Sequence, residues 1–243
     1  LKPNTKVLPF GFNYPLGLSY QPKIFQFRQF FSNPYWMLRY YRMLSGYFDF
    51  RTFEAKPFLP KIPKVLFQVR LWDPSSAKDP ENQSQRTRIN QFRIDCIRAL
   101  KNQFPAYFLG GVTDSEYARL VCPDLILDNA RTQRVSYFSF LRKSAIGIST
   151  TGLHNSIGWK MGEYIAASKA IVSEDLCYQV PGNFQPTQNY LSFKNTDELL
   201  SQIDRLLSLP HEIQEMMNAN HRYYQNFLSP DQLVWKILKQ IQE

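Results

Sequence analysis

Short apolar runs alternate with amphipathic stretches along most of the chain, and turn-forming residues separate them. Apolar runs of four or five residues predict buried strands, whereas apolar positions that recur every three or four residues predict helices. The predicted strands are 65–69, 107–109, 125–127, 146–149, 170–173 and 190–193, with Gly110 and Gly111 ending the second one. The predicted helices are 86–102, 115–121, 134–143, 159–167, 197–207 (capped by Thr196), 211–227 and 230–242, and a polar loop is predicted at 73–85.

This alternation of strands and helices is typical of a parallel sheet with helices on both faces. We therefore predict an α/β, Rossmann-like domain over residues 61–243. Residues 1–60 lack the alternation, since prolines punctuate them and one helix, at 34–47, is predicted there. The predicted organisation is an irregular, aromatic-rich amino-terminal segment that ends in a proline-rich linker, followed by one α/β domain.

The charge of the chain is concentrated in that first segment. The net charge is +9, and residues 1–60 hold eight Lys or Arg against two Asp or Glu, together with 17 of the 37 aromatic residues. A basic, aromatic segment suits an anionic membrane surface, a nucleic acid or an anionic acceptor. Packing of these aromatics into a core is the alternative. We predict no nucleic-acid partner, because that function would leave the region 149–172 unexplained.

The cysteines and the hydropathy of the chain point to a cytoplasmic protein. Cys96, Cys122 and Cys177 have neither metal-ligand spacing nor the pattern of a disulfide framework, so we expect buried or half-buried thiols in a reducing compartment. No apolar run reaches the roughly 18 residues of a spanning helix, and no signal peptide is evident. The chain begins with Leu1 rather than Met, which leaves open that a further domain precedes it.

The region 149–172 carries the clearest chemical pattern. A predicted strand ends at its start, a loop of small polar residues follows, and a helix containing Glu163 leads into a short apolar strand. In open α/β sheets ligands bind at the carboxyl ends of the strands, and the amides of a helix start favour anions such as phosphate. The region therefore predicts a nucleotide-type ligand, with Glu163 placed to accept hydrogen bonds from ribose hydroxyls.

Several signatures of other enzyme classes are absent from the sequence. There is no Gly-x4-Gly-Lys-Ser/Thr, which disfavours a P-loop NTPase, and no Gly-x-Gly-x-x-Gly follows the first strand, which disfavours a dinucleotide oxidoreductase. A Gly-x-Ser-x-Gly elbow and an Asp-x-Asp pair are also missing. We accordingly predict no metal site and no cofactor.

Motifs in the order of the chain suggest a family. Val69-Arg70-Leu71 follows the first strand, 134–149 forms a helix and strand, and Asn155–Val172 is similar to the pattern Glu-Gly-Phe-Gly-Leu-Pro-Leu-Leu-Glu-Ala-Met-Ala-Cys-Gly-Lys-Pro-Val-Val. With these motifs, residues 64–243 resemble the carboxyl-terminal, nucleotide-sugar-binding half of a group 1 (family 4-like) GT-B glycosyltransferase. The positions that coincide in the last pattern are Gly158, Glu163, Ala166, Lys169 and Val172.

The resemblance implies a role for individual residues at a donor site. Glu163 would bind the ribose, Arg70 would lie near the diphosphate, and Lys160 would meet an anion at the helix start. The remaining members of the implied site are the loop residues His154, Asn155, Ser156 and Gly158.

Two departures from the family pattern matter. Asn155 stands where retaining members often carry the first Glu of a Glu-x7-Glu pair, which leaves retention or inversion open. A second basic residue after Arg70 has no clear counterpart, and Lys78 and Arg86 are the alternatives.

The implied activity is transfer of a hexosyl or related sugar from a nucleotide-activated donor. The implied acceptor is a glycan or lipid-linked glycan in cell-surface polysaccharide synthesis, and the nucleotide-sugar is a substrate rather than a cofactor. Residues 1–60 would then be a remnant of the acceptor half that docks on the anionic inner face of the membrane. The alternative is a non-catalytic fragment of a two-domain transferase that binds a nucleotide or a glycan.

Overall fold

The computed structural model describes residue 12 and residues 52–242, so the predicted helix at 34–47 lies outside the described residues. Among the described residues, one sheet of five parallel strands has the order β2-β1-β3-β4-β5. The strands are β1 (Lys64–Val69), β2 (Phe108–Val112), β3 (Ser144–Ser149), β4 (Ala170–Ser173) and β5 (Leu191–Ser192). The predicted α/β fold with a parallel sheet is therefore confirmed.

A single bridge extends the sheet beyond β2. Ile126 pairs in parallel with Val112, and the amide of Leu127 donates to the Val112 carbonyl at 2.9 Å. Counting this bridge as a reduced strand, the order of the sheet becomes the 3-2-1-4-5-6 order of dinucleotide-binding folds. The predicted strand at 125–127 is thus shortened to one bridge, and residues Pro123–Leu125 form a 3-10 turn instead.

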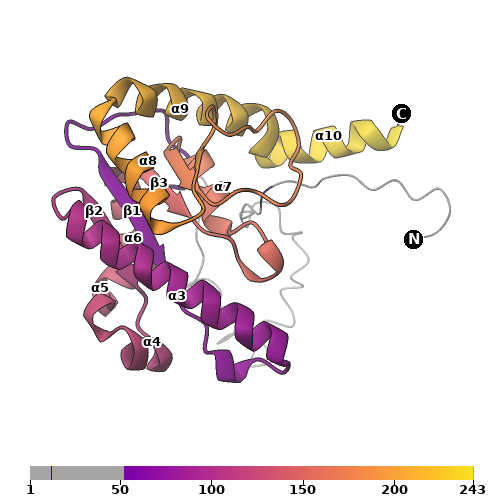
Figure 1. Cartoon of the computed structure of the whole chain (residues 1–243). Helices are drawn as coiled ribbons and strands as arrows, with labels where there is room; N and C mark the ends of the chain where they lie inside the picture. Colours follow the sequence, from indigo (N-terminus) through magenta and orange to yellow (C-terminus); the bar gives the residue numbers. More distant parts are fainter. Residues whose placement is uncertain (1–11, 13–51, 243) are drawn as a thin grey trace, which may run out of the picture.

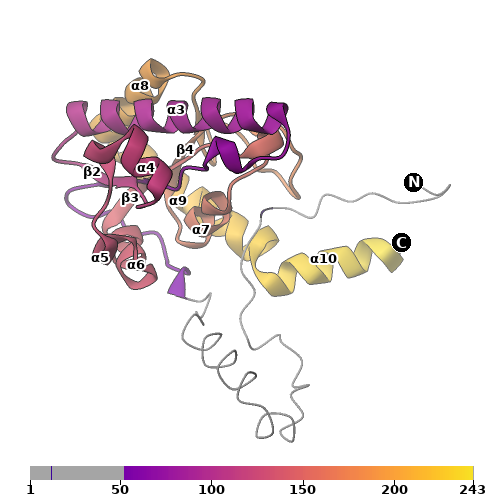
Figure 2. The same cartoon turned by 90° about the horizontal axis from the view of Figure 1, so that it is seen from below.

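Helices cover both faces of the sheet. Figure 2 shows α3 and α8 on one side of the strands and α5, α6 and α7 on the other. The helices are α3 (Pro80–Gln103), α4 (Glu116–Val121), α5 (Asn129–Thr132), α6 (Arg134–Lys143), α7 (Trp159–Ala166), α8 (Thr196–Ser208), α9 (Pro210–Tyr223) and α10 (Pro230–Gln242). Short 3-10 turns lie at Pro74–Ser76, Pro123–Leu125 and Leu153–Asn155, and a π-helical turn, Tyr224–Leu228, follows α9.

Two hydrophobic layers hold the helices onto the sheet. Successive side chains of β1 point to opposite faces, so Val65 and Phe67 join the core under α3 and α8, whereas Leu66 joins the core under α6 and α7. Tyr164 of α7 is fully buried against β3, where a Cβ on Gly147 would lie 2.6 Å from its ring. Burial of such side chains, about 1.5–3 kcal/mol each, fixes α7 relative to the sheet.

The segment before β1 packs against the helices of the second layer. Phe53 is buried, and its ring packs edge-on against the Phe138 ring with the two ring centroids 4.8 Å apart. The amide of Ala55 donates to the Ala166 carbonyl at the end of α7 at 3.1 Å. The described part of the segment that precedes residue 60 therefore contributes to this core, while the domain boundary itself stays a prediction.

Three of the boundaries that differ from the sequence prediction have a clear physical cause. α3 begins at Pro80, inside the predicted loop, because the Asp79 carboxylate caps the helix by accepting from the Asn82 amide at 2.8 Å. β2 continues through Gly110 and Gly111, which the prediction took as its end. Glycine is required at 110 inside the strand, because a Cβ there would clash with the backbone of β1. The cap of α8 is Asn195 rather than Thr196, which already lies in the helix.

The last helix leaves the body of the domain. Figures 1 and 2 show α10 extending away from the sheet layers, and its side chains Val234, Trp235 and Leu238 are exposed. None of the helices in residues 52–242 combines the length and the apolar character needed to cross a bilayer.

Candidate functional site

A crevice is expected where the direction of the sheet order reverses. From β1 the chain moves outward to β2, and from β3 it moves the other way to β4 and β5, so β1 and β3 are neighbours at the switch point. Ligands of open α/β sheets bind outside the carboxyl ends of the strands at such a point. The loops that leave these two ends are 70–79 after β1 and 150–158 after β3.

The 150–158 loop is folded on itself. The amide of Gly152 donates to the Ser156 carbonyl at 2.8 Å, and the amide of Ser156 donates to the Leu153 carbonyl at 3.1 Å. His154 and Asn155 form its tip with left-handed backbone angles, φ 58° and φ 56°, which residues of these two types adopt more readily than most.

The tip of this loop is held from two other elements. The amide of His154 donates to Oε1 of Gln85 on α3 at 3.0 Å, and the hydroxyl of Tyr178 donates to the His154 carbonyl at 2.8 Å. The side chains of His154, Asn155 and Ser156 are exposed. The predicted loop residues thus lie together at the carboxyl end of β3, with their side chains accessible to a ligand.

The start of α7 approaches the end of β3 closely. A Cβ on Gly158, the N-cap residue, would lie 3.3 Å from the Thr150 carbonyl oxygen, so glycine suits this position. Among the residues that the structure describes, no side chain caps α7. Its first amides are therefore available to an anion, as at other helix starts. Trp159, the first helical residue, is 60% exposed beside them.

Glu163 is held by a polar cluster between α6 and α7. Its Oε2 accepts from the Tyr137 hydroxyl at 2.6 Å and lies 3.7 Å from Nζ of Lys160. The Lys160 ammonium also lies over the Tyr137 ring, 3.5 Å from its centroid. Burial raises the pKa of the Tyr137 hydroxyl well above its usual value, so that this group is a neutral donor to Glu163.

This cluster changes how Lys160 and Glu163 can act. Burial lowers the pKa of Lys160 and Glu163 opposes the shift, so the two side chains form a partly compensated pair rather than two independent charges. About a third of the Lys160 side chain, 34%, remains exposed, against 15% of Glu163. Within the part of the chain that the structure describes, both contacts to the carboxylate use Oε2, which leaves Oε1 for a ligand hydroxyl.

Arg70 lies directly after β1, at the other side of the switch point. Its side chain is exposed, and this side chain makes no hydrogen bond or ion pair with the residues of 52–242. Of the two alternatives for a second cation, Arg86 donates through Nη1 to the Asp73 carbonyl at 2.8 Å and to the Ser76 hydroxyl at 2.6 Å, which engages it in the 70–79 loop. Lys78 is exposed in the same loop.

The structure adds a buried arginine that the sequence reasoning missed. Arg93 of α3 is only 8% exposed, and its guanidinium lies 4.7 Å from the centre of the Trp72 ring. Burial lowers its pKa to about 10, and the nearby Glu174 opposes the shift, so the group stays charged at neutral pH. The signal was present in the sequence, because a charged residue stands on the apolar stripe formed by Ile89 and Ile97.

Two hollows in the described residues are lined by residues outside the 70–79 and 150–158 loops. One lies between α8, α9 and Thr187, and another lies beside β2, under Phe140 and Leu127. Within residues 52–242, no three His, Cys, Asp or Glu side chains gather in a group that could hold a metal ion. The absence of a metal requirement stays a prediction.

The chain was compared with protein families, curated sequences and solved structures. No protein-family model and no curated protein sequence matches the chain. Among solved structures it is similar to the C-terminal domain of a glycosyl transferase group 1 family protein, LpcC, from Francisella tularensis, with 13% identity and a TM-score of 0.48 over 70% of this chain and 89% of that one. It is also similar to TarM, with 15% identity and a TM-score of 0.46 over 76% of this chain and 37% of that one.

The first of these structures carries the class name that the sequence resemblance gives. Of TarM, the chain matches little more than a third, 37%. Both TM-scores lie below 0.5, so neither similarity carries an argument, and the function proposed below rests on the residues of the chain itself.

Proposed function

We propose that this chain is a glycosyltransferase domain that binds a nucleotide-activated sugar at the carboxyl ends of β1 and β3. One observation carries the proposal: Arg70, the 150–158 loop and the uncapped start of α7 all lie at the point where the sheet order reverses. This is the position where α/β sheets bind nucleotides. The family resemblance of residues 64–243 supports the same ligand.

The diphosphate of the donor would be bound by charge and by backbone amides. Arg70 presents a guanidinium that no residue of 52–242 engages, and its planar fork matches phosphate oxygens. The first amides of α7, beside Gly158, donate to the same group. As the bond to the sugar breaks, negative charge develops on the departing nucleoside diphosphate, and these fixed donors stabilise it.

The ribose would be bound by the second turn of α7. Glu163 is oriented by Tyr137, and its Oε1, which no residue of 52–242 engages, would accept from a hydroxyl. Lys160, at the start of α7, would contact the phosphate only after a rotamer change that breaks its 3.7 Å pair with Glu163. His154 and Asn155, at the loop tip, would face the sugar. We assign no catalytic base, and Asn155 supplies no negative charge toward the sugar.

The biological setting is proposed from the sequence. The basic, aromatic composition of residues 1–60 supports docking on an anionic inner membrane surface, where a glycan or lipid-linked acceptor for cell-surface polysaccharide would be presented. The reaction would need neither a metal nor a cofactor, and the chain would act in the cytoplasm.

A binding and turnover experiment tests the proposal. Thermal shift against UDP-, GDP-, CMP- and dTDP-sugars identifies the donor, calorimetry gives its Kd, and release of the nucleotide in the presence of glycan acceptors reports transfer. Arg70→Met should raise the Kd about tenfold or more. Arg142→Met is the matched control, because this exposed arginine precedes β3 at the opposite end of the sheet.

Each result has a distinct meaning. Binding with transfer supports the enzyme, and binding without transfer favours the non-catalytic, donor-binding fragment. The absence of binding to all four classes of nucleotide-sugar, or equal Kd values for the Arg70→Met and Arg142→Met variants, would contradict the proposed site.

A further inference from the structure

Arg93 links the two loops that flank the crevice. Its Nη1 donates to the Arg70 carbonyl at 3.0 Å, at the end of β1. Its Nε donates to the Thr150 hydroxyl at 3.0 Å, and its Nη2 donates to the Thr151 carbonyl at 3.3 Å, both at the end of β3. Each of the three guanidinium nitrogens donates one hydrogen bond and the residue is only 8% exposed, so this side chain is built into the fold.

The same helix holds both loops at further points. The side-chain amide of Asn90, one turn before Arg93, accepts from the Trp72 amide at 3.1 Å and donates to the Trp72 carbonyl at 2.6 Å. Gln85 accepts from the His154 amide at 3.0 Å. α3 is a single helix of 24 residues. It therefore acts as a rigid support to which the loop with Arg70 and the loop with His154 are both fixed.

Glu174 fixes the second loop from the opposite side. Glu174 directly follows β4, and its Oε2 accepts from the amide of Thr151 at 2.7 Å and from the hydroxyl of Thr151 at 3.0 Å. Thr151 thus accepts from the arginine through its carbonyl and donates to the glutamate through its amide. The negative charge of Glu174 compensates the buried guanidinium across this residue, which makes a buried charge at this place tolerable.

We infer that Arg93, with Glu174 opposite it, is a positioning residue that sets the spacing between Arg70 and the 150–158 loop. The inference rests on the proposed function, because this spacing decides whether one diphosphate can meet the Arg70 side chain and the α7 amides together. A displacement of about 1 Å in a reacting group is sufficient to cost a large factor in rate. A purely structural arginine would instead change the stability of the whole domain.

Hydrogen exchange measures the anchoring without any ligand. The amides of Thr151, Gly152, His154 and Ser156 all donate hydrogen bonds, so their protection reports how firmly the loop is held. In Arg93→Met we expect exchange at these amides to accelerate about tenfold or more, with the amides of α8 unchanged. Arg93→Lys should behave like Arg93→Met, because an ammonium restores the charge but not the fork that reaches three acceptors.

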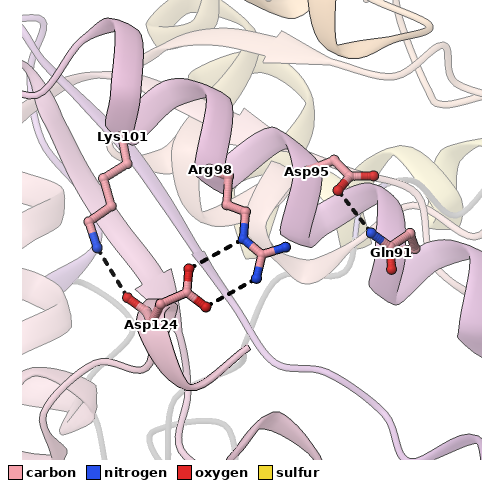
Figure 3. A network of polar contacts seen from close by, with 5 residues as sticks. All are labelled: Gln91, Asp95, Arg98, Lys101 and Asp124. Atoms are coloured by element: carbon pink, nitrogen blue, oxygen red, sulfur yellow. Dashed lines mark hydrogen bonds and ion pairs between the residues drawn. The ribbon is translucent and has the colours of Figure 1, made fainter. Parts of the chain in front are cut away.

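A second arginine of α3 supplies the matched control. Arg98 donates through Nε and Nη2 to the Asp124 carboxylate at 3.3 and 3.1 Å, and Lys101 donates to the Asp124 carbonyl at 3.1 Å, as Figure 3 shows. This pair is about half exposed and fixes the turn Pro123–Leu125, not the crevice. Arg98→Met should leave both the loop exchange and nucleotide affinity as in the wild type.

Calorimetry with UDP, GDP, dTDP and CMP on the full chain completes the test. The inference expects the Arg93 variants to raise the Kd of the nucleotide that binds best about tenfold, and to accelerate loop exchange. If Arg93→Met does not fold, Thr150→Val and Glu174→Gln replace it. Each of these variants should also raise the Kd and accelerate exchange in the 150–158 loop. Unchanged loop exchange, exchange that rises equally in α8, or faster loop exchange with an unchanged Kd would overturn the inference. If the wild type binds none of the four nucleotides, the proposed function fails, while the exchange data still decide whether Arg93 anchors the loop.

Discussion

Replacing Glu163 by Gln removes a charge while nearly preserving the shape of the side chain. The Tyr137 hydroxyl, 2.6 Å from Oε2, can still donate to an amide oxygen, although a hydrogen bond to a charged acceptor is the stronger one. The ion pair with Lys160, at 3.7 Å and partly exposed, contributes about 0.5 kcal/mol after screening. We therefore expect the free energy of unfolding to fall by about 1 kcal/mol, which lowers Tm by about 2–4 °C.

Glu163→Gln should also weaken nucleotide binding, and this loss of affinity does not follow from the small loss of stability. A hydroxyl bound to a carboxylate contributes about 1.5–3 kcal/mol, against about 0.5–1.5 kcal/mol for a neutral acceptor. The difference corresponds to a Kd that rises about tenfold. Calorimetry with the nucleotide-sugar that gives the largest thermal shift measures it, and Glu163→Ala should weaken binding by about 1–3 kcal/mol.

A glutamate outside the crevice provides the control. Glu212 of α9 pairs with Arg205 at 2.8 Å, and its side chain is 21% exposed, close to the exposure of Glu163. Glu212→Gln should lower stability by a similar amount and leave the Kd unchanged. An unaltered Kd in a folded Glu163→Gln variant would refute the role of this carboxylate in binding the ribose.

Other features of the structure give three further predictions. Lys169 is buried with a pKa of about 8, below that of an unfolded lysine, so at this site the unfolded chain binds more protons between about pH 8 and 10.5, and the site contributes a rise of roughly 3 kcal/mol to the free energy of unfolding. Other groups titrate in the same range, so the measurement is the difference in free energy of unfolding between the wild type and Lys169→Met, which chemical denaturation should show to change by this amount in favour of the wild type from about pH 8 to 10.5, and a constant difference would contradict the buried lysine. Cys177 is exposed, whereas burial raises the pKa of Cys96 to about 12, so a thiol reagent should label one cysteine quickly in the native chain and the others only on unfolding, and fast labelling of Cys96 would contradict the buried position. Asn195→Ala should cost about 1 kcal/mol in denaturant unfolding, because the side chain caps α8, while Thr196→Ala should cost less, and the reverse order would restore Thr196 as the cap.

The parts of the fold with regular patterns could be predicted from the sequence. The helix 134–143 and the strand 170–173 were predicted with the bounds that the structure has, since each is a single uninterrupted pattern. The start of α3 was not, because polar residues dominate its first two turns and only Asp79 followed by a proline marks the cap. The second strand was predicted too short, because its two glycines were taken as a turn, although the backbone of β1 beside Gly110 and the residues Leu125 and Leu127 beside Gly111 leave no room for a side chain there.

The residues of the candidate site could be predicted from the sequence, but the long-range contacts that hold them in place could not. The loop 150–158, the helix start and Glu163 follow one another in the chain, so their proximity follows from local structure. The contacts of Arg93 with Thr150 and of Tyr137 with Glu163 join residues 57 and 26 positions apart, which no local pattern reveals. The expectation of buried or half-buried cysteines was wrong for Cys177, which is exposed after β4.

The most direct test of the account is to map nucleotide binding by NMR on the ¹⁵N-labelled chain during titration with UDP, GDP, dTDP and CMP. The account predicts that one of these nucleotides shifts the backbone amides of Gly158, Trp159 and Lys160 together with that of Arg70, while the amides of α8 and α9 stay in place. Shifts confined to the hollow between α8 and α9, or saturation of binding with no change at Gly158 and Arg70, would contradict it.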